Sequence, residues 1–356
     1  MGRRDNNIIS RRFPISVLTG FLGSGKTTVL NYLTQQPSLK RALLLINEFG
    51  EIGIDSDLVT RVTDDVVIEM SSGCICCSIR SDITDTLTKA LRRFSKEDHF
   101  LFDRVIIETT GLADPAPIIQ TLMAEPKISS HFYLQGVVAT VDAVNGGGTL
   151  DKQIEAVKQV AVADQVLVTK TDLADKITLE RLQNRVRLLN PAAPQVLAKN
   201  GVVDPAALLH DSFYDPNSKS IDLQNWLKAE SYSNDHNKKQ GHHHHHDDDD
   251  INRHHAQIKP FCLTIDEPIL NGALDIWLRT LLMFRGADLL RIKGIVNVVG
   301  ENGPVIIHAV QHILHPKATL EQWPSEDHRS RIVFITRNID PSELIDSLKS
   351  LTIQNT

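Results

Sequence analysis

Residues 13–30 read F-P-I-S-V-L-T-G-F-L-G-S-G-K-T-T-V-L, and this stretch decides the fold. A short apolar run of strand type, Ile15 to Leu18, leads into residues 20–27, which fit G-x-x-x-x-G-K-[ST] at every fixed position. Val29, Leu30 and Leu33 then recur at helical spacing. A motif of this kind between a strand and a helix predicts a phosphate-binding loop.

The residue types of the loop suit that chemistry. Its glycines let the backbone curl so that consecutive N–H groups face an anion, and the helix N-terminus adds a favourable dipole. Lys26 would place a positive charge on the outer phosphates, and Thr27 would offer its hydroxyl to Mg²⁺. The expected nucleotide contacts of the loop are Gly20, Phe21, Leu22, Gly23, Ser24, Gly25, Lys26, Thr27 and Thr28.

Length and composition limit the class of protein. A chain of 356 residues suggests two or three domains, and 41% hydrophobic with 23% charged residues is an ordinary globular balance. The formal net charge of −6, without a long basic cluster, argues against a nucleic-acid partner. We expect a cytoplasmic location and no membrane partner, because no run of 18 apolar residues and no apolar signal segment is present.

Apolar runs alternate with helical patterns up to about residue 200. A continuous run such as Ala42–Ile46 is typical of a strand buried on both faces of a parallel sheet. The alternation predicts an α/β fold with a doubly wound, mostly parallel sheet. Further strands are expected at residues 66–70, 102–108, 136–141, 166–168 and 195–198.

Polar residues follow two of these strands. Glu108 ends one, where a nucleotide hydrolase holds Mg²⁺, and Gly111 can offer its N–H to the terminal phosphate. Thr169, Lys170, Thr171 and Asp172 follow another. The Asp172 carboxylate could accept both N–H donors on the edge of guanine, which favours GTP over ATP, although a polar turn with a helix cap would look similar.

Three of the four cysteines lie within four residues, as Cys74, Cys76 and Cys77. Such clustering outside a disulfide framework points to metal or redox chemistry, and thiolates are the ligands that Zn²⁺ and Cu⁺ prefer. In an extended chain Cys77 would point away from the other two, so the loop must curl, or Glu48 or Glu51 must complete the site. The alternative is three reduced thiols without a metal.

The second half of the chain begins with a change of composition. Residues 231–257 contain five consecutive His followed by four consecutive Asp and are expected to be a linker, either merely solvated or binding metals weakly. From residue 258, strand and helix patterns predict a smaller α+β unit, in which residues 291–299 and 305–310 alternate as strands. We expect a tail at 1–12, a nucleotide domain at 13–230, the linker, and a C-terminal domain at 258–356.

These motifs together resemble the CobW-like family of P-loop GTPases, the metal-chaperone branch. The similarity rests on residues 20–28, 47–55 (N-E-F-G-E-I-G-I-D), 73–77 (G-C-I-C-C), 108–115 (E-T-T-G-L-A-D-P) and 169–172, with R-I-K-G and V-Q-H further on. It implies a P-loop GTPase sheet, Cys74, Cys76 and Cys77 as metal thiolates, and Lys170 and Asp172 as guanine contacts. Thr169 replaces the first residue of the usual N-K-x-D.

The resulting hypothesis is a slow GTPase that binds GTP or GDP and Mg²⁺ and delivers a metal, most simply zinc, to a client metalloprotein. Its nucleotide state would gate metal affinity at the cysteines, and it would act as a monomer or dimer. Three alternatives fit the same residues: a GTP-dependent metal sensor without delivery, a chaperone for cobalt or iron enzymes, and a P-loop ATPase or kinase with an unrelated cysteine cluster.

Overall fold

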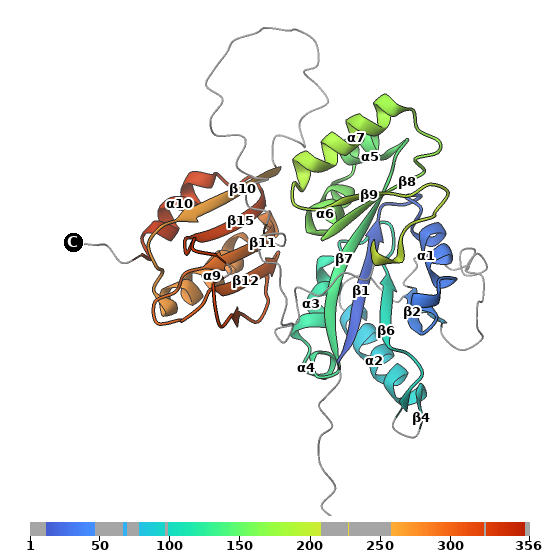
Figure 1. Cartoon of the computed structure of the whole chain (residues 1–356), viewed down its shortest axis with the longest axis horizontal. Coiled ribbons are helices and arrows are strands. Elements are labelled where there is room, and N and C mark those ends of the chain that lie inside the picture. The colour runs from blue at the N-terminus through green and yellow to red at the C-terminus, as the bar shows by residue number, and fades with distance from the viewer. Residues whose placement is uncertain are drawn as a thin grey trace, which may run out of the picture.

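The computed structural model describes residues 12–46, 67–69, 78–96, 99–207, 227, 258–323 and 325–352. Two large sheets form within these ranges (Figure 1). No helix of this described part is long and apolar enough to cross a bilayer.

The first sheet has seven strands in the order β3-β2-β6-β1-β7-β8-β9, and every pairing in it is parallel. This confirms the predicted doubly wound sheet. Because all strands run the same way, their carboxyl ends lie on one edge, where such sheets bind ligands. The strands are β1 (Phe13–Gly20), β2 (Ala42–Ile46), β3 (Val67–Glu69), β6 (Arg104–Glu108), β7 (Phe132–Asp142), β8 (Gln165–Thr169) and β9 (Gln195–Leu197).

Helices cover both faces of this sheet. Apolar residues of α1, such as Val29 and Leu33, pack with Leu18 and Leu44 on one face. Ile83 and Leu87 of α2 pack with Val17 on the other, beside α3. The helices are α1 (Lys26–Thr34), α2 (Ser78–Arg93), α3 (Ala116–Ala124), α4 (Pro126–Ser129), α5 (Gly146–Lys152), α6 (Ile154–Val162) and α7 (Lys176–Leu189).

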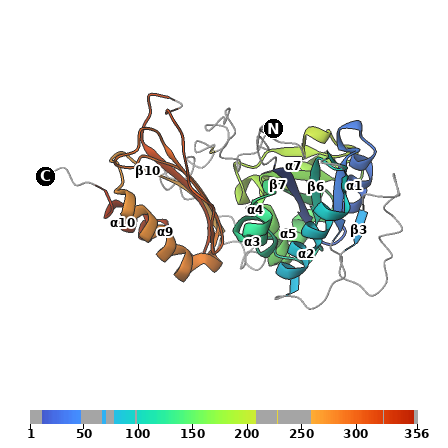
Figure 2. The ribbon, with the colours of Figure 1, turned by 90° about the horizontal axis from the view of Figure 1, so that it is seen from below.

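The C-terminal sheet is antiparallel, in the order β10-β15-β11-β12-β13, with β14 paired to β12. Two helices pack on one of its faces, so this part is the expected α+β unit (Figure 2). Its elements are β10 (Ile258–Ile265), α9 (Asn271–Arg285), β11 (Leu289–Val296), β12 (Val305–Val310), β13 (Ile313–Leu314), β14 (Ala318–Thr319), β15 (Ser330–Arg337) and α10 (Pro341–Lys349). A short hairpin of β4 (Ser95–Lys96) and β5 (His99–Phe100) completes the described elements.

The other face of the C-terminal sheet packs against the first unit. Leu290 and Ile295 of β11 share one hydrophobic cluster with Val157 and Val160 of α6. Consequently every residue of β11 is buried, including Arg291. The strand predicted at 291–299 is present as β11 over Leu289–Val296, and neither of its faces is left to solvent.

Candidate nucleotide site

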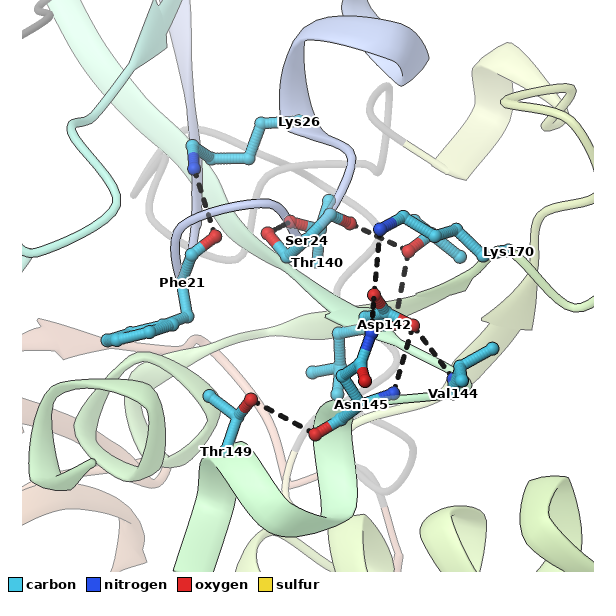
Figure 3. A network of polar contacts seen from close by, with 11 residues as sticks. Phe21, Ser24, Lys26, Thr140, Asp142, Val144, Asn145, Thr149 and Lys170 are labelled. Carbon is cyan, nitrogen blue, oxygen red and sulfur yellow. Dashed lines mark hydrogen bonds and ion pairs between the residues drawn. The ribbon is translucent and has the colours of Figure 1, made fainter. Parts of the chain in front are cut away.

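The phosphate loop joins the end of β1 to the start of α1. Gly23 and Gly25 adopt φ angles of 70° and 88°, in the left-handed region that side chains with a Cβ avoid. At Gly20 a Cβ atom would lie 2.2 Å from Thr140 Oγ1, so the neighbouring strand β7 also requires glycine there. The Ser24 and Thr140 hydroxyls are 2.6 Å apart and fasten the loop to β7 (Figure 3).

Lys26 folds back over the loop. Its Nζ donates to the carbonyl oxygens of Gly20, at 2.9 Å, and Phe21, at 3.2 Å (Figure 3). The side chain is buried, so a cation is held within the curve of the loop. A phosphate arriving there would meet a positive charge already in place.

Two oxygen-bearing side chains meet beside the loop. Thr27 Oγ1 donates to Glu108 Oε1 at 3.1 Å, although 81 residues separate them. The contact follows from the sheet, since β6 pairs with β1 and Glu108 lies opposite Leu18. A hydroxyl and a buried carboxylate this close are the hard oxygen donors that suit Mg²⁺. The predicted pair of magnesium residues therefore fits the ion in both position and chemistry.

The loop after Glu108 lies directly against the phosphate loop. A Cβ atom on Gly111 would come within 2.6 Å of the Leu22 nitrogen and 2.8 Å of its Cα. Only glycine permits that approach to backbone atoms. The arrangement brings Gly111 to the same loop that carries Lys26.

Thr169 links the predicted base-binding loop to the phosphate loop. Its Oγ1 donates to Ser24 O at 2.7 Å and lies 3.2 Å from Val141 O. The threonine therefore ties the two loops together although it replaces the usual asparagine. Lys170 follows in the left-handed region, with φ 55°.

Asp142, at the end of β7, was missed by the sequence analysis. Its Oδ2 accepts from Lys170 Nζ at 2.7 Å, and its Oδ1 accepts from the backbone of Val144 and Asn145 (Figure 3). Burial alone would raise the pKa of Asp142, but these hydrogen bonds outweigh it and lower the pKa. The available signal was a carboxylate directly after the predicted strand at 136–141.

The loop after β9, residues 198–201, contacts both the predicted base-binding loop and the helix that follows the phosphate loop. Asp172 Oδ1 accepts the N–H of Asn200 at 3.0 Å, and Thr171 Oγ1 donates to Ala198 O at 3.1 Å. Asn200 and Gly201 both have positive φ, and a Cβ on Gly201 would touch Thr28. Residues 198–201 therefore join the phosphate helix to the base loop. Sequence reasoning placed 195–198 in a strand and gave the turn no role.

A cavity of about 150 Å³ lies beside the phosphate loop. Phe21–Ser24 line one side, and Asp142, Asn145 and Lys170 line the other. Neither Lys26 nor Asp172 borders it. The cavity therefore adjoins the expected nucleotide position but does not coincide with it.

The predicted metal ligands Glu48, Glu51, Cys74, Cys76 and Cys77 lie outside the described residues, as does the linker 231–257. Within the described part, no group of three His, Cys, Asp or Glu side chains could hold a metal. Strand β3, which precedes the cysteines, pairs in parallel with β2 and places Glu69 opposite Ile46.

Comparison with known proteins agrees with this geometry. Residues 14–197 match the CobW/HypB/UreG nucleotide-binding domain, and residues 258–352 match the cobalamin synthesis protein cobW C-terminal domain. The zinc chaperone YjiA of Escherichia coli is 30% identical over 93% of this chain and 96% of its own length. The zinc chaperone CobW of a Sinorhizobium species is 37% identical, over 56% of this chain and 62% of that protein.

Among solved structures, Zn(II)-bound YjiA GTPase from E. coli aligns with a TM-score of 0.65 at 25% identity, over 96% of this chain and 99% of that one. Both domain matches, the near full-length relative and the phosphate loop beside Glu108 lead to one assignment. The chain belongs to the CobW/HypB/UreG family, carries the CobW C-terminal domain, and is a P-loop GTPase.

Proposed function

We propose that this protein is a metal chaperone that hydrolyses GTP and delivers zinc to a client metalloprotein, with nucleotide state controlling zinc affinity at Cys74, Cys76 and Cys77. The observation that carries the proposal is the placement of β3. This strand, which leads to the cysteines, runs parallel to β2 and β6, and β6 ends in Glu108. The names of two relatives as zinc chaperones support the choice of metal.

In this account the described residues prepare the phosphates for attack by water. Lys26 holds their charge, and Thr27 and Glu108 would hold Mg²⁺, which when bound would supply positive charge beside the phosphates. Gly111 offers its N–H to the terminal phosphate, and Asp172 accepts the donors of guanine. Loss of the terminal phosphate then removes its contact with Gly111, and the loops on the same sheet edge can rearrange.

At the cargo site, the cysteines bind zinc as thiolates, so binding releases protons and weakens as the pH falls. Glu48 or Glu51 would supply a further ligand. Reduced cysteines of this kind suit a cytoplasmic protein.

The chain offers a matched control for the cysteines. Cys262 lies on β10, in the C-terminal unit, and its burial raises the pKa of the thiol to about 11. A thiol that stays protonated is a poor zinc ligand. Cys262→Ser should therefore leave zinc binding intact, whereas Cys76→Ser should remove the tight site.

The proposed function is tested by loading the reduced protein with zinc and following its release to a chromophoric chelator. Release should be faster during GTP hydrolysis than with GDP alone, in wild type and in Cys262→Ser. Equal zinc content of Cys76→Ser and wild type would reject the cysteine site. Equal release with GTP and GDP would reject nucleotide-driven delivery.

A further inference from the structure

Loop 109–115, between Glu108 and α3, is held on more than one side. On one side Gly111 presses against the backbone of Leu22 in the phosphate loop. On another, α6 supplies Gln159, whose Nε2 donates to Gly111 O at 3.2 Å and to Ala113 O at 3.0 Å. Gln159 is 1% exposed, so this amide is fixed within the protein. Helix α6 therefore holds loop 109–115 in place beside the phosphate loop.

The third contact comes from the C-terminal unit. Gln311, in the turn between β12 and β13, donates from Nε2 to Asp114 Oδ2 at 2.8 Å. Lys158 of α6 donates to the same oxygen at 2.9 Å, and Asp114 Oδ1 accepts the N–H of Ala116. A residue 197 positions further along the chain thus contacts the end of the loop that follows Glu108.

Gln311 is the first residue of the two-residue turn, 311–312, that joins β12 to β13. Its φ is 49°, in the left-handed region that such hairpin turns commonly require. From this turn the side chain reaches Asp114. The C-terminal unit therefore has a direct hydrogen bond to the loop that follows Glu108.

The nucleotide-binding unit and the C-terminal unit also contact each other at residues other than Gln311. Arg291 and Lys293 of β11 form ion pairs with Asp164, which follows α6. Burial alone would raise the pKa of Asp164, but these two cations outweigh it and lower the pKa to about 2. With the shared hydrophobic cluster, this contact holds the units together away from loop 109–115.

We propose that Gln311 is a positioning residue for GTP hydrolysis: through Asp114, the C-terminal unit holds loop 109–115 in the conformation that presents Gly111 to the terminal phosphate. Displacement of the C-terminal unit, as by a client, would remove the Gln311 hydrogen bond from Asp114, leaving only Lys158 and the Ala116 N–H, and would slow hydrolysis. The inference rests on the proposed role of Gly111 and adds to it a contribution from the second domain in the same chain.

The first test breaks the Gln311–Asp114 hydrogen bond. Gln311→Glu keeps the shape of the side chain but places a carboxylate against Asp114. Single-turnover GTP hydrolysis should slow roughly five- to fiftyfold, the loss expected when a charge-assisted hydrogen bond to a catalytic loop is broken. GTP affinity should stay within about twofold, because the phosphate loop and base loop are untouched.

The double variant Asp114→Asn, Gln311→Glu restores the bond with donor and acceptor exchanged, and Lys158 can then pair with the new carboxylate. It should recover most of the lost rate. Gln311→Asn is a second variant: asparagine tolerates positive φ but is one methylene too short, so it should also be slow. Lys293→Met, which weakens the other interdomain contact, should hydrolyse GTP at the wild-type rate.

Folding of each variant is checked by its melting temperature. Wild-type rates in Gln311→Glu and Gln311→Asn would overturn the inference, as would equal slowing in Lys293→Met or a double variant no faster than Gln311→Glu. Gly111→Ala tests the proposed role of the loop separately, because its Cβ would displace the loop from Leu22. A slow Gly111→Ala with unaffected Gln311 variants would leave the proposed function standing and reject only the contribution of Gln311.

Discussion

At the scale of single residues, the phosphate loop holds the Lys26 cation with its own carbonyl oxygens. Lys26 is bonded to Gly20 O and Phe21 O, and the Thr27 hydroxyl already contacts Glu108. Preorganised charges of this kind lower the cost of reaching the transition state, because they need not reorient during reaction. Removing the Lys26 charge should therefore lower the rate of GTP hydrolysis more than it lowers the stability of the fold.

The first prediction concerns Lys26→Ala. Wild type should hydrolyse GTP slowly, on the order of 10⁻⁴ to 10⁻² per second, since we assign no water-positioning side chain. The variant should show no measurable turnover, while its circular dichroism spectrum stays that of wild type. Phosphate release over several hours measures both rates. Wild-type turnover above about ten per second without a partner would contradict the slow-switch account.

The second prediction concerns nucleotide choice. Asp172→Asn keeps an oxygen for the Asn200 N–H but turns a donor toward the donors of guanine. GTP should bind about ten- to a hundredfold more weakly, as expected for loss of charge-assisted hydrogen bonds. Calorimetric titration of wild type and variant with GTP and ATP measures this. Equal affinity of wild type for the two nucleotides would remove the guanine assignment.

At the scale of elements, the C-terminal sheet carries a buried group of charged and titratable residues: Arg291 and Lys293 on β11, His308 on β12, and His315 directly after β13. Burial, then Arg291, lowers the pKa of His315 to about 3, and Asp164 opposes this only in part. Burial, His315, Arg291 and Lys293 lower the pKa of His308 well below its usual value. The two rings are joined by an Nδ1–Nδ1 contact of 3.2 Å.

The third prediction follows from His315. In the folded state His315 stays neutral down to about pH 3, whereas in the unfolded chain it takes up a proton near pH 6.5. The contribution of His315 to the free energy of unfolding is therefore fully present above pH 6.5 and is lost as the pH falls toward 3. Each such histidine contributes a slope of about 1.4 kcal/mol per pH unit. His315→Gln should reduce the slope by about that amount between pH 5.5 and 4, measured by urea denaturation. Identical slopes would show that His315 does not resist protonation.

The order and type of most elements could be predicted from the sequence, because apolar runs and helical spacing are local signals. The strand expected at 102–108 begins at Arg104, and Phe102 lies before it with its ring 4.9 Å from the Phe13 ring, centroid to centroid. The long-range contacts of the candidate site could not be predicted from the sequence. Asp142–Lys170 spans 28 residues and Asp114–Gln311 spans 197, and local patterns carry no information about such pairings.

The burial of β11 shows the same limit. A strand containing Arg291 and Lys293 looks half exposed in sequence, because charged residues are seldom buried. In the fold, Asp164 compensates both charges and α6 covers the strand. Sequence alone gave no sign that two units would share one hydrophobic cluster.

At the scale of the whole molecule, the fourth prediction concerns the His and Asp segment at 242–250, which lies outside the described residues. Neutral imidazoles bind divalent metals weakly, so the segment should act as a metal reservoir. Its deletion should leave GTP hydrolysis and the tightest zinc site unchanged and lower the number of weakly bound ions. Equilibrium dialysis with zinc counts them. If the deletion removed the tightest zinc site, the assignment of that site to Cys74, Cys76 and Cys77 would be wrong.

The most direct test of the account is the zinc affinity in three nucleotide states. Strands β3, β2, β6 and β1 open on one sheet edge, so a terminal phosphate at Gly111 can influence the loops that carry the predicted zinc ligands. By linkage, a change in zinc affinity with GTP must be matched by an equal change in GTP affinity with zinc, typically about 5- to 150-fold.

That measurement is a competition titration against a zinc-sensitive dye, with a non-hydrolysable GTP analogue, with GDP and without nucleotide, in wild type and Cys76→Ser. The account predicts different affinities in the GTP-analogue and GDP states of wild type. It also predicts loss of both the site and the difference in Cys76→Ser, which should still bind GTP. Indistinguishable affinities across the three states of wild type would contradict nucleotide-gated zinc handling.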